Sequence, residues 1–122
     1  VDIFLSNKKL RKQIMGIKTD STPIESPKDA ENCNVFKLYK LLATDKKSKE
    51  LEVKYNQGNY GYGDAKKELF ELICDKYKDQ KERYSYLMEN KDILDEELLK
   101  GAKKARIIAR QVLNRVRNNI GY

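Results

Sequence analysis

The residues best suited to chemistry are the cations near the end of the chain. Between Lys100 and Arg117 there are seven basic residues and no acidic one. If this stretch is an α-helix, a turn of 100° per residue places four of the seven in one narrow stripe. These four are Lys103, Arg106, Arg110 and Arg117. A stripe of cations with this spacing can follow a phosphate backbone.

A second interpretation of the same charges needs no ligand. Four acidic residues between Asp92 and Glu97 precede the basic run. Acids at the start of a helix and bases at its end complement the helix dipole, and they stabilise a helix whatever its function. Both interpretations of the charge layout remain open from the sequence.

A glycine- and tyrosine-rich turn lies before a predicted helix: residues 58–63 read Gly-Asn-Tyr-Gly-Tyr-Gly. Backbone N–H groups at a helix N-terminus can approach a phosphate, and Tyr60 and Tyr62 could stack on unpaired bases. The spacing is not that of a Walker loop, and no strand precedes it. The alternative is a tight turn whose tyrosines cover the core. Charge and pattern add three further candidate RNA contacts: Lys66, Lys67 and Arg83.

The sequence offers no set of residues for catalysis. It has no histidine, which is the commonest general base and metal ligand, and no nucleophile, base and orienting group can be assembled from the rest. Cys33 and Cys74 are too few for a disulfide framework or a zinc site, and free thiols suit a reducing cytosol. We therefore expect no catalytic residue, no metal and no cofactor in this chain.

Composition points to an anionic partner. The 122 residues are enough for one domain, and 26 Lys and Arg against 19 Asp and Glu give a net charge of +7. Such a balance favours nucleic acid first and an anionic membrane surface second. No apolar run is long enough to span a bilayer and no signal peptide is visible, so a cytoplasmic location is expected.

Apolar spacing predicts an all-α bundle of five helices, three short and two long. We expect a connecting segment at 1–31, which includes the first helix, and the bundle at 32–122. The helices are expected at 7–17, from 32 or 34 to about 42, at 49–56, at 64–89, and from 90 or 92 to 118. The buried side of the 64–89 helix is expected to include Tyr77, Tyr84, Leu87 and Met88.

The last predicted helix carries a coiled-coil-like apolar seam with alternating steps of four and three residues. The seam consists of Leu98, Ala102, Ala105, Ala109, Val112 and Val116. Ile107 lies on the opposite side of that helix. The opening helix needs an apolar partner for Leu10, Ile14 and Ile17, so we expect it to pack over Ile107. The alternatives are that Ile107 is an isolated surface residue or that the catalytic domain covers it.

Five segments in order carry a family resemblance. They are Thr-Asp-Ser at 19–21, Asn-Cys-Asn-Val-Phe-Lys-Leu-Tyr at 32–39, Gly-Tyr-Gly-Asp-Ala-Lys-Lys-Glu-Leu at 61–69, Glu-Arg-Tyr at 82–84 and Gly-Ala-Lys-Lys-Ala-Arg at 101–106. Together they resemble the segments that follow the lysine-rich ATP-site loop in bacterial-type tryptophanyl-tRNA synthetases. The resemblance covers nearly the whole chain.

The resemblance implies a function. These synthetases are class I enzymes, usually cytoplasmic homodimers, in which a Rossmann-type domain uses ATP with magnesium to activate tryptophan. A helical domain binds the tRNA anticodon. The chain would be that C-terminal anticodon-binding domain, with the tRNA for tryptophan and its own catalytic domain as partners, and would do no chemistry by itself. The alternatives are the corresponding domain of a tyrosyl-tRNA synthetase and a free-standing helical protein-interaction module.

Overall fold

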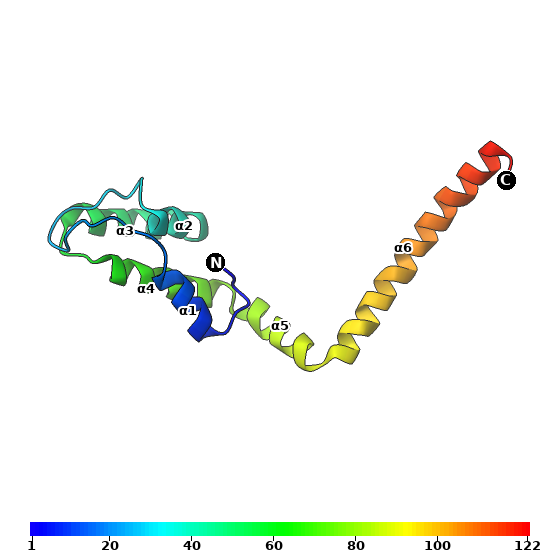
Figure 1. Ribbon diagram of the computed structural model, residues 1–122, viewed down its shortest axis with the longest axis horizontal. Coiled ribbons are helices and arrows are strands. Elements are labelled where there is room, and N and C mark those ends of the chain that lie inside the picture. Colours follow the sequence, from blue (N-terminus) through cyan, green and yellow to red (C-terminus); the bar gives the residue numbers. More distant parts are fainter. The chain divides into compact units, whose positions relative to one another are not determined.

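The computed structural model describes all 122 residues and contains six α-helices and no strand, which confirms the predicted all-α class. The helices are α1 Asn7–Met15, α2 Asn34–Leu42, α3 Asp45–Gln57, α4 Tyr62–Lys76, α5 Lys78–Glu89 and α6 Lys91–Ile120 (Figure 1). The chain forms two compact units, Val1–Lys81 and Glu82–Tyr122.

The first unit is built around α4. This helix packs against both α1 and α2, and α2 also packs against α3 (Figure 1). The inward side of α4 consists of Ala65, Leu69 and Ile73, which recur at steps of four residues and are at most 2% exposed. Burial of a Leu or Ile side chain contributes about 1.5–3 kcal/mol, so these positions hold the unit together.

The third helix begins earlier than the sequence predicted. The expected start was Lys49, whereas α3 begins at Asp45. The side-chain oxygen of Thr44 accepts a hydrogen bond from the backbone N–H of Lys47, which satisfies one donor of the first turn. This cap extends the helix by a full turn.

The prediction of one long helix at 64–89 is wrong, because the helix is interrupted at Tyr77. The backbone of Tyr77 has φ −108° and ψ 19°, outside the helical region, and separates α4 from α5. The predicted buried side is also wrong beyond this point: Tyr84 and Met88 are exposed, and α5 buries none of its residues. The apolar period continues through the break, which is why the sequence alone suggested one helix.

The packing predicted for Ile107 is also wrong. Ile107 is 60% exposed. Leu10 and Ile14 of the opening helix are instead completely buried in the core of the first unit, where α1 packs on α4. The opening helix did need an apolar partner, as expected, but it finds that partner on α4.

Tyr55 of α3 lies at the centre of an aromatic cluster and is completely buried. Its ring centroid lies 5.6 Å from that of Phe36, 6.0 Å from that of Tyr60 and 6.2 Å from that of Tyr62. Tilted and edge-on ring pairs at such distances add to the free energy gained by burial. The Tyr55 hydroxyl lies 3.4 Å from the thiol of Cys33, so its polar end is also partnered inside the core.

Lys28 holds the loop that contains Pro23 and Pro27 against this cluster through hydrogen bonds. Its side chain is 3% exposed, and its ammonium donates to three loop carbonyls, at Pro23, Ile24 and Ser26. Its backbone N–H donates to the carbonyl of Tyr55 at 2.8 Å, and its ammonium lies 5.3 Å from the centre of the Tyr62 ring. A buried ammonium is tolerated here because all three of its protons have acceptors.

Asp20 ties the same loop to the start of α4. The hydroxyl of Tyr62 donates to the Asp20 carboxylate at 2.6 Å, and the backbone N–H of Thr22 donates at 3.0 Å. The bond from Tyr62 is the main cause that lowers the pKa of Asp20. Burial, and then the bond to Asp20, raise the pKa of Tyr62 to about 12. The Thr-Asp-Ser segment therefore has a structural role.

Replacement of Gly58 by Ala should destabilise the first unit. Gly58 has φ +76° and ψ −172°, a conformation that is essentially restricted to glycine, and an added Cβ would lie 2.5 Å from the carbonyl oxygen of Glu25. Backbone strain alone costs about 1–3 kcal/mol, and the clash adds to it. Urea unfolding of Gly58→Ala should show this loss in the free energy of unfolding.

Gly63→Ala is the matched control. Nothing lies within 4 Å of a Cβ at Gly63, and the residue sits in the first turn of α4. Alanine favours a helix over glycine by up to about 1 kcal/mol, so this variant should be neutral or slightly more stable. Equal free energies for the two variants would contradict the close approach of Gly58 to the loop.

Stability should fall in alkali, and Tyr62 should account for part of this fall. Its pKa is about 12 in the folded protein, whereas an unfolded tyrosine releases its proton near pH 10. The contribution of Tyr62 is therefore complete below about pH 10 and is lost as the pH rises from about 10 to 12. Tyr62→Phe should flatten this fall in urea titrations, whereas Tyr122→Phe, at a position 88% exposed, should not. Identical pH profiles for all three proteins would contradict the role given to Tyr62.

Candidate nucleic-acid interface

A shallow groove on α6 brings together three of the predicted contact residues. It is lined by Lys103, Arg106 and Arg110 together with Ile107. All four side chains are exposed and belong to one helix, where steps of three and four residues place them side by side. Ile107 was expected in internal packing, and its place in this groove was not predicted. The spacing from Lys103 to Ile107 is the signal that could have shown it.

Complementation of the helix dipole does not account for this groove. The dipole acts within the first and last turns of a helix. In α6, which ends at Ile120, the basic residue of the last turn is Arg117. Lys103, Arg106 and Arg110 lie further from the end than that turn. The dipole interpretation therefore applies to Arg117 and leaves the three groove cations without a structural explanation.

The groove cations also lack acidic partners. The ion pairs in the chain are Lys54–Glu68 and Lys100–Glu97, with the second at 3.0 Å on α6 itself. None of the groove cations takes part in either pair. Three exposed, unpaired cations on one rigid helix form a surface that attracts phosphate groups.

The remaining predicted cations lie elsewhere in the chain. On α4, the Lys66 ammonium donates to the carbonyl of Met15 at 3.0 Å and so caps the end of α1, whereas Lys67 is exposed. On α5, Arg83 is exposed, and its guanidinium lies 5.4 Å from the centre of the Tyr86 ring. Lys66 therefore has a structural partner, while Lys67 and Arg83 remain available to a ligand.

The geometry of Tyr60 and Tyr62 favours core packing. Both rings are half-buried against Tyr55, and the Tyr62 hydroxyl is bound to Asp20. The Tyr60 hydroxyl is fully buried, and burial is the main cause that raises its pKa. Lys54 lies 5.6 Å from the centre of the Tyr60 ring. These contacts agree with the alternative that the two tyrosines cover the core.

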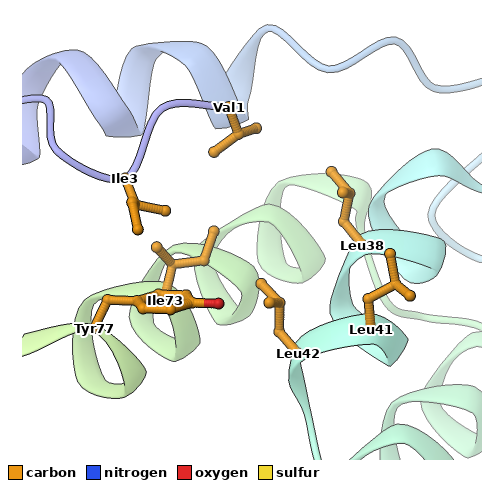
Figure 2. A pocket seen from close by; sticks show the side chains of 7 residues that line it. All are labelled: Val1, Ile3, Leu38, Leu41, Leu42, Ile73 and Tyr77. Carbon is orange, nitrogen blue, oxygen red and sulfur yellow. The ribbon is translucent and has the colours of Figure 1, made fainter. Parts of the chain in front are cut away.

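A second hollow lies in the first unit, and its chemistry is different. Figure 2 shows the side chains that line an apolar cavity between the first residues, α2 and the end of α4. The volume of this cavity is about 180 Å³. Its lining residues are Val1, Ile3, Leu38, Leu41, Leu42, Ile73 and Tyr77. The Tyr77 hydroxyl is the one polar side-chain group among them, so the cavity suits neither a phosphate nor a nucleotide.

No group of three or more His, Cys, Asp or Glu side chains is arranged to hold a metal ion. Cys33 is buried and Cys74 is half-buried, and both are free thiols. None of the six helices combines the length and the apolar character needed to cross a bilayer.

Comparison with known proteins gives one consistent answer. The chain is 46% identical over 121 residues to the tryptophan–tRNA ligase of Campylobacter jejuni, and 39% identical over 121 residues to that of Fusobacterium nucleatum. Each alignment covers 99% of this chain but only 38% and 37% of the respective ligase. The chain therefore spans less than two fifths of the length of these relatives. No family model matches it.

A solved structure agrees with the sequence comparison. The crystal structure of tryptophanyl-tRNA synthetase from Campylobacter jejuni, complexed with ADP and tryptophan, matches with a TM-score of 0.93 and 45% identity. The match covers 100% of this chain and 38% of that one. The whole helical fold described above therefore has a counterpart within a solved synthetase.

Proposed function

We propose that this chain, a homologue over nearly its whole length of part of tryptophan–tRNA ligase, is the helical domain that binds the tRNA anticodon in such an enzyme. The ligase attaches tryptophan to its tRNA with ATP. In this proposal the 122 residues bind RNA, and the chemistry belongs to the part of the enzyme they do not include. The tRNA for tryptophan is the partner, and the complete enzyme is a cytoplasmic homodimer.

The observation that carries the proposal is the row of unpaired cations on α6. Lys103, Arg106 and Arg110 are exposed, share one groove and have no acidic neighbour that would explain them. Phosphate contacts of this kind fix the position of an RNA without reading its sequence. Lys67 and Arg83 are the further cations proposed to contact RNA, because both are exposed.

No ATP chemistry is assigned to these residues. The relative that was solved with ADP and tryptophan is about two and a half times as long as this chain. The chain has no histidine, and its described acidic and sulfur-containing side chains form no metal-binding group. In the proposal, nucleotide binding, with its magnesium, belongs to the part of the enzyme outside these 122 residues.

The relatives favour tryptophan over tyrosine as the amino acid of the parent enzyme. The compared ligases are named for tryptophan, at identities of up to 46%. The corresponding domain of a tyrosyl-tRNA synthetase is the less supported alternative. The salt dependence of RNA binding, described next, also tests the alternative of a free-standing protein-interaction module. Binding through an apolar protein interface would respond little to moderate salt.

Binding of a tRNA for tryptophan should be weak and strongly dependent on salt. If the three groove cations each contact one phosphate, the affinity should fall about 40-fold between 50 and 200 mM salt. Arg106→Glu with Arg110→Glu should weaken binding at every salt concentration and reduce the salt dependence. Fluorescence anisotropy with labelled tRNA measures both quantities.

The control variant reverses the same amount of charge on α3 rather than in the groove. Lys46→Glu with Lys47→Glu changes two exposed cations on α3 by the same total charge. This variant should retain most of the affinity if binding depends on the groove rather than on net charge. A hairpin of the anticodon arm should bind better than a hairpin of the acceptor arm. Equal loss of affinity in both charge variants, or equal binding of the two hairpins, would refute the assignment.

A further inference from the structure

The outer side of α1 carries a second group of cations, and it belongs to the first unit. Between Ile3 and Thr19 the chain has five basic residues and no acidic one. They are Lys8, Lys9, Arg11, Lys12 and Lys18, and all five are exposed. The first four lie on α1 itself, a helix of nine residues. The groove on α6 does not account for this charge, because the two helices belong to different units.

The packing of α1 fixes which of its sides is free within the first unit. α1 lies against α4 (Figure 1), and Leu10 and Ile14 on its inner side are completely buried. At 100° per residue, Lys8 lies about 140° and Lys12 about 180° around the helix from the middle of this buried side. Arg11 is the neighbour of Lys8 at a spacing of three residues. Lys8, Arg11 and Lys12, here called the α1 cations, therefore share one surface turned away from the core.

The α1 cations have no acidic partner. Neither of the two ion pairs in the chain includes a residue of α1. Asp2 is the one acid among the first 19 residues, and its carboxylate accepts a hydrogen bond from the backbone N–H of Phe4. The backbone N–H of Asp2 donates to the side chain of Gln13, which lies about 160° around α1 from Arg11. The surface formed by the α1 cations is thus left without a neutralising charge.

The stability of α1 does not explain these charges either. Lys8 and Lys9 lie in the first turn, where the positive end of the helix dipole disfavours cations, and no acid lies there. Lys8 and Lys12 are four residues apart, a spacing at which like charges repel. Lys81 adds a further cation at the start of the helix, where its ammonium donates to the side chain of Asn7 at 2.6 Å. A ligand with several negative charges would relieve this repulsion.

We propose that the outer side of α1 is a second phosphate-binding surface, at which Lys8, Arg11 and Lys12 contact the backbone of the RNA. The inference rests on the proposed function, because that function supplies the RNA. It adds a contact surface on the first unit to the groove on α6. Ammonium and guanidinium groups form charge-assisted hydrogen bonds with phosphate oxygens, and such contacts position an RNA without reading its sequence.

An anionic membrane surface is a poorer partner for α1. A basic helix that lies on a membrane buries an apolar side among the lipids. The apolar side of α1 is formed by Leu10 and Ile14, which belong to the core of the first unit. The helix therefore has no apolar side left to insert. An acidic protein is the other partner that the charge allows, and the experiments below distinguish it from RNA.

Acetylation of lysines, followed by mass spectrometry, tests the proposal on the unmodified 122-residue chain. In the free chain, Lys8 and Lys12 should react with acetic anhydride as readily as Lys46 and Lys47, which are exposed on α3. A saturating tRNA for tryptophan should slow the reaction of Lys8 and Lys12 at least about fivefold, because a phosphate favours the charged ammonium and only the neutral amine is acylated. Lys46 and Lys47 should react at the same rate with and without tRNA.

Two results of the acetylation experiment would overturn the proposal. Slow reaction of Lys8 and Lys12 in the free chain would mean that α1 is covered. Equal protection of the lysines on α1 and α3 by tRNA would mean that the RNA has no preference for α1.

Charge removal on α1 gives a second measurement. With the α1 cations added to the three groove cations, six phosphate contacts should make the affinity fall about 2000-fold between 50 and 200 mM salt, instead of about 40-fold for the groove alone. Lys8→Gln with Lys12→Gln removes two contacts while keeping good helix formers, and should reduce this fall to about 150-fold. The matched control, Lys46→Gln with Lys47→Gln, should keep the salt dependence of the unmodified chain.

Thermal unfolding shows whether the α1 variant keeps its fold. Its melting temperature should be no lower than that of the unmodified chain, since Lys8 and Lys12 have no structural partner. A salt dependence of RNA binding equal to that of the α3 control would overturn the proposal.

The remaining outcomes separate this inference from the proposed function. Absence of tRNA binding by the unmodified chain would refute the proposed function. If the groove variant weakens binding and the α1 variant behaves like the α3 control, the proposed function stands and the inference alone is wrong. Unchanged RNA binding by the α1 variant, together with lost binding to phosphatidylserine vesicles or to polyglutamate, would identify a membrane or an acidic protein as the partner of α1 and overturn the proposal.

Discussion

The first unit depends on the complete burial of Tyr55. A tyrosine can be enclosed only if other rings surround it and its hydroxyl finds a partner, and here Phe36, Tyr60 and Tyr62 supply the rings and Cys33 the partner. The carbonyl of Tyr55 also receives the backbone N–H of Lys28. Tyr55 of α3 therefore positions both the irregular loop and the start of α4. Gly58 follows α3 and approaches the loop so closely that a Cβ there would clash with the carbonyl oxygen of Glu25.

Helix type and most helix positions followed from the sequence because they depend on local periodicity. The six-helix structure retains α1, α2 and α6 within a few residues of their expected limits. The break at Tyr77 was not predictable in the same way, since the apolar period runs through it and no glycine or proline marks it. The packing of α1 was missed because a spacing shows which side of a helix is apolar but not which neighbour will cover it.

The candidate site was predictable in part for the same reason. Lys103, Arg106 and Arg110 share a groove because one helix carries them, so their spacing was sufficient. Lys66 and Tyr62 were chosen by charge and residue type, and their partners, Met15 and Asp20, lie 51 and 42 residues away. Contacts between residues so distant in the sequence are set by the fold, and no local pattern records them.

The order of charges along α6 also affects how a polyanion arrives. The acids occupy the first turns and the bases lie beyond them, so the whole charges of the side chains oppose and outweigh the half-charges of the backbone dipole. From Asp92 to Arg117 the helix is about 38 Å long. A polyanion near this helix is repelled at one end and attracted along the rest, which exerts a torque. For the RNA partner proposed above, this torque would orient the two molecules before contact and raise the rate of association, independently of the affinity of the final complex.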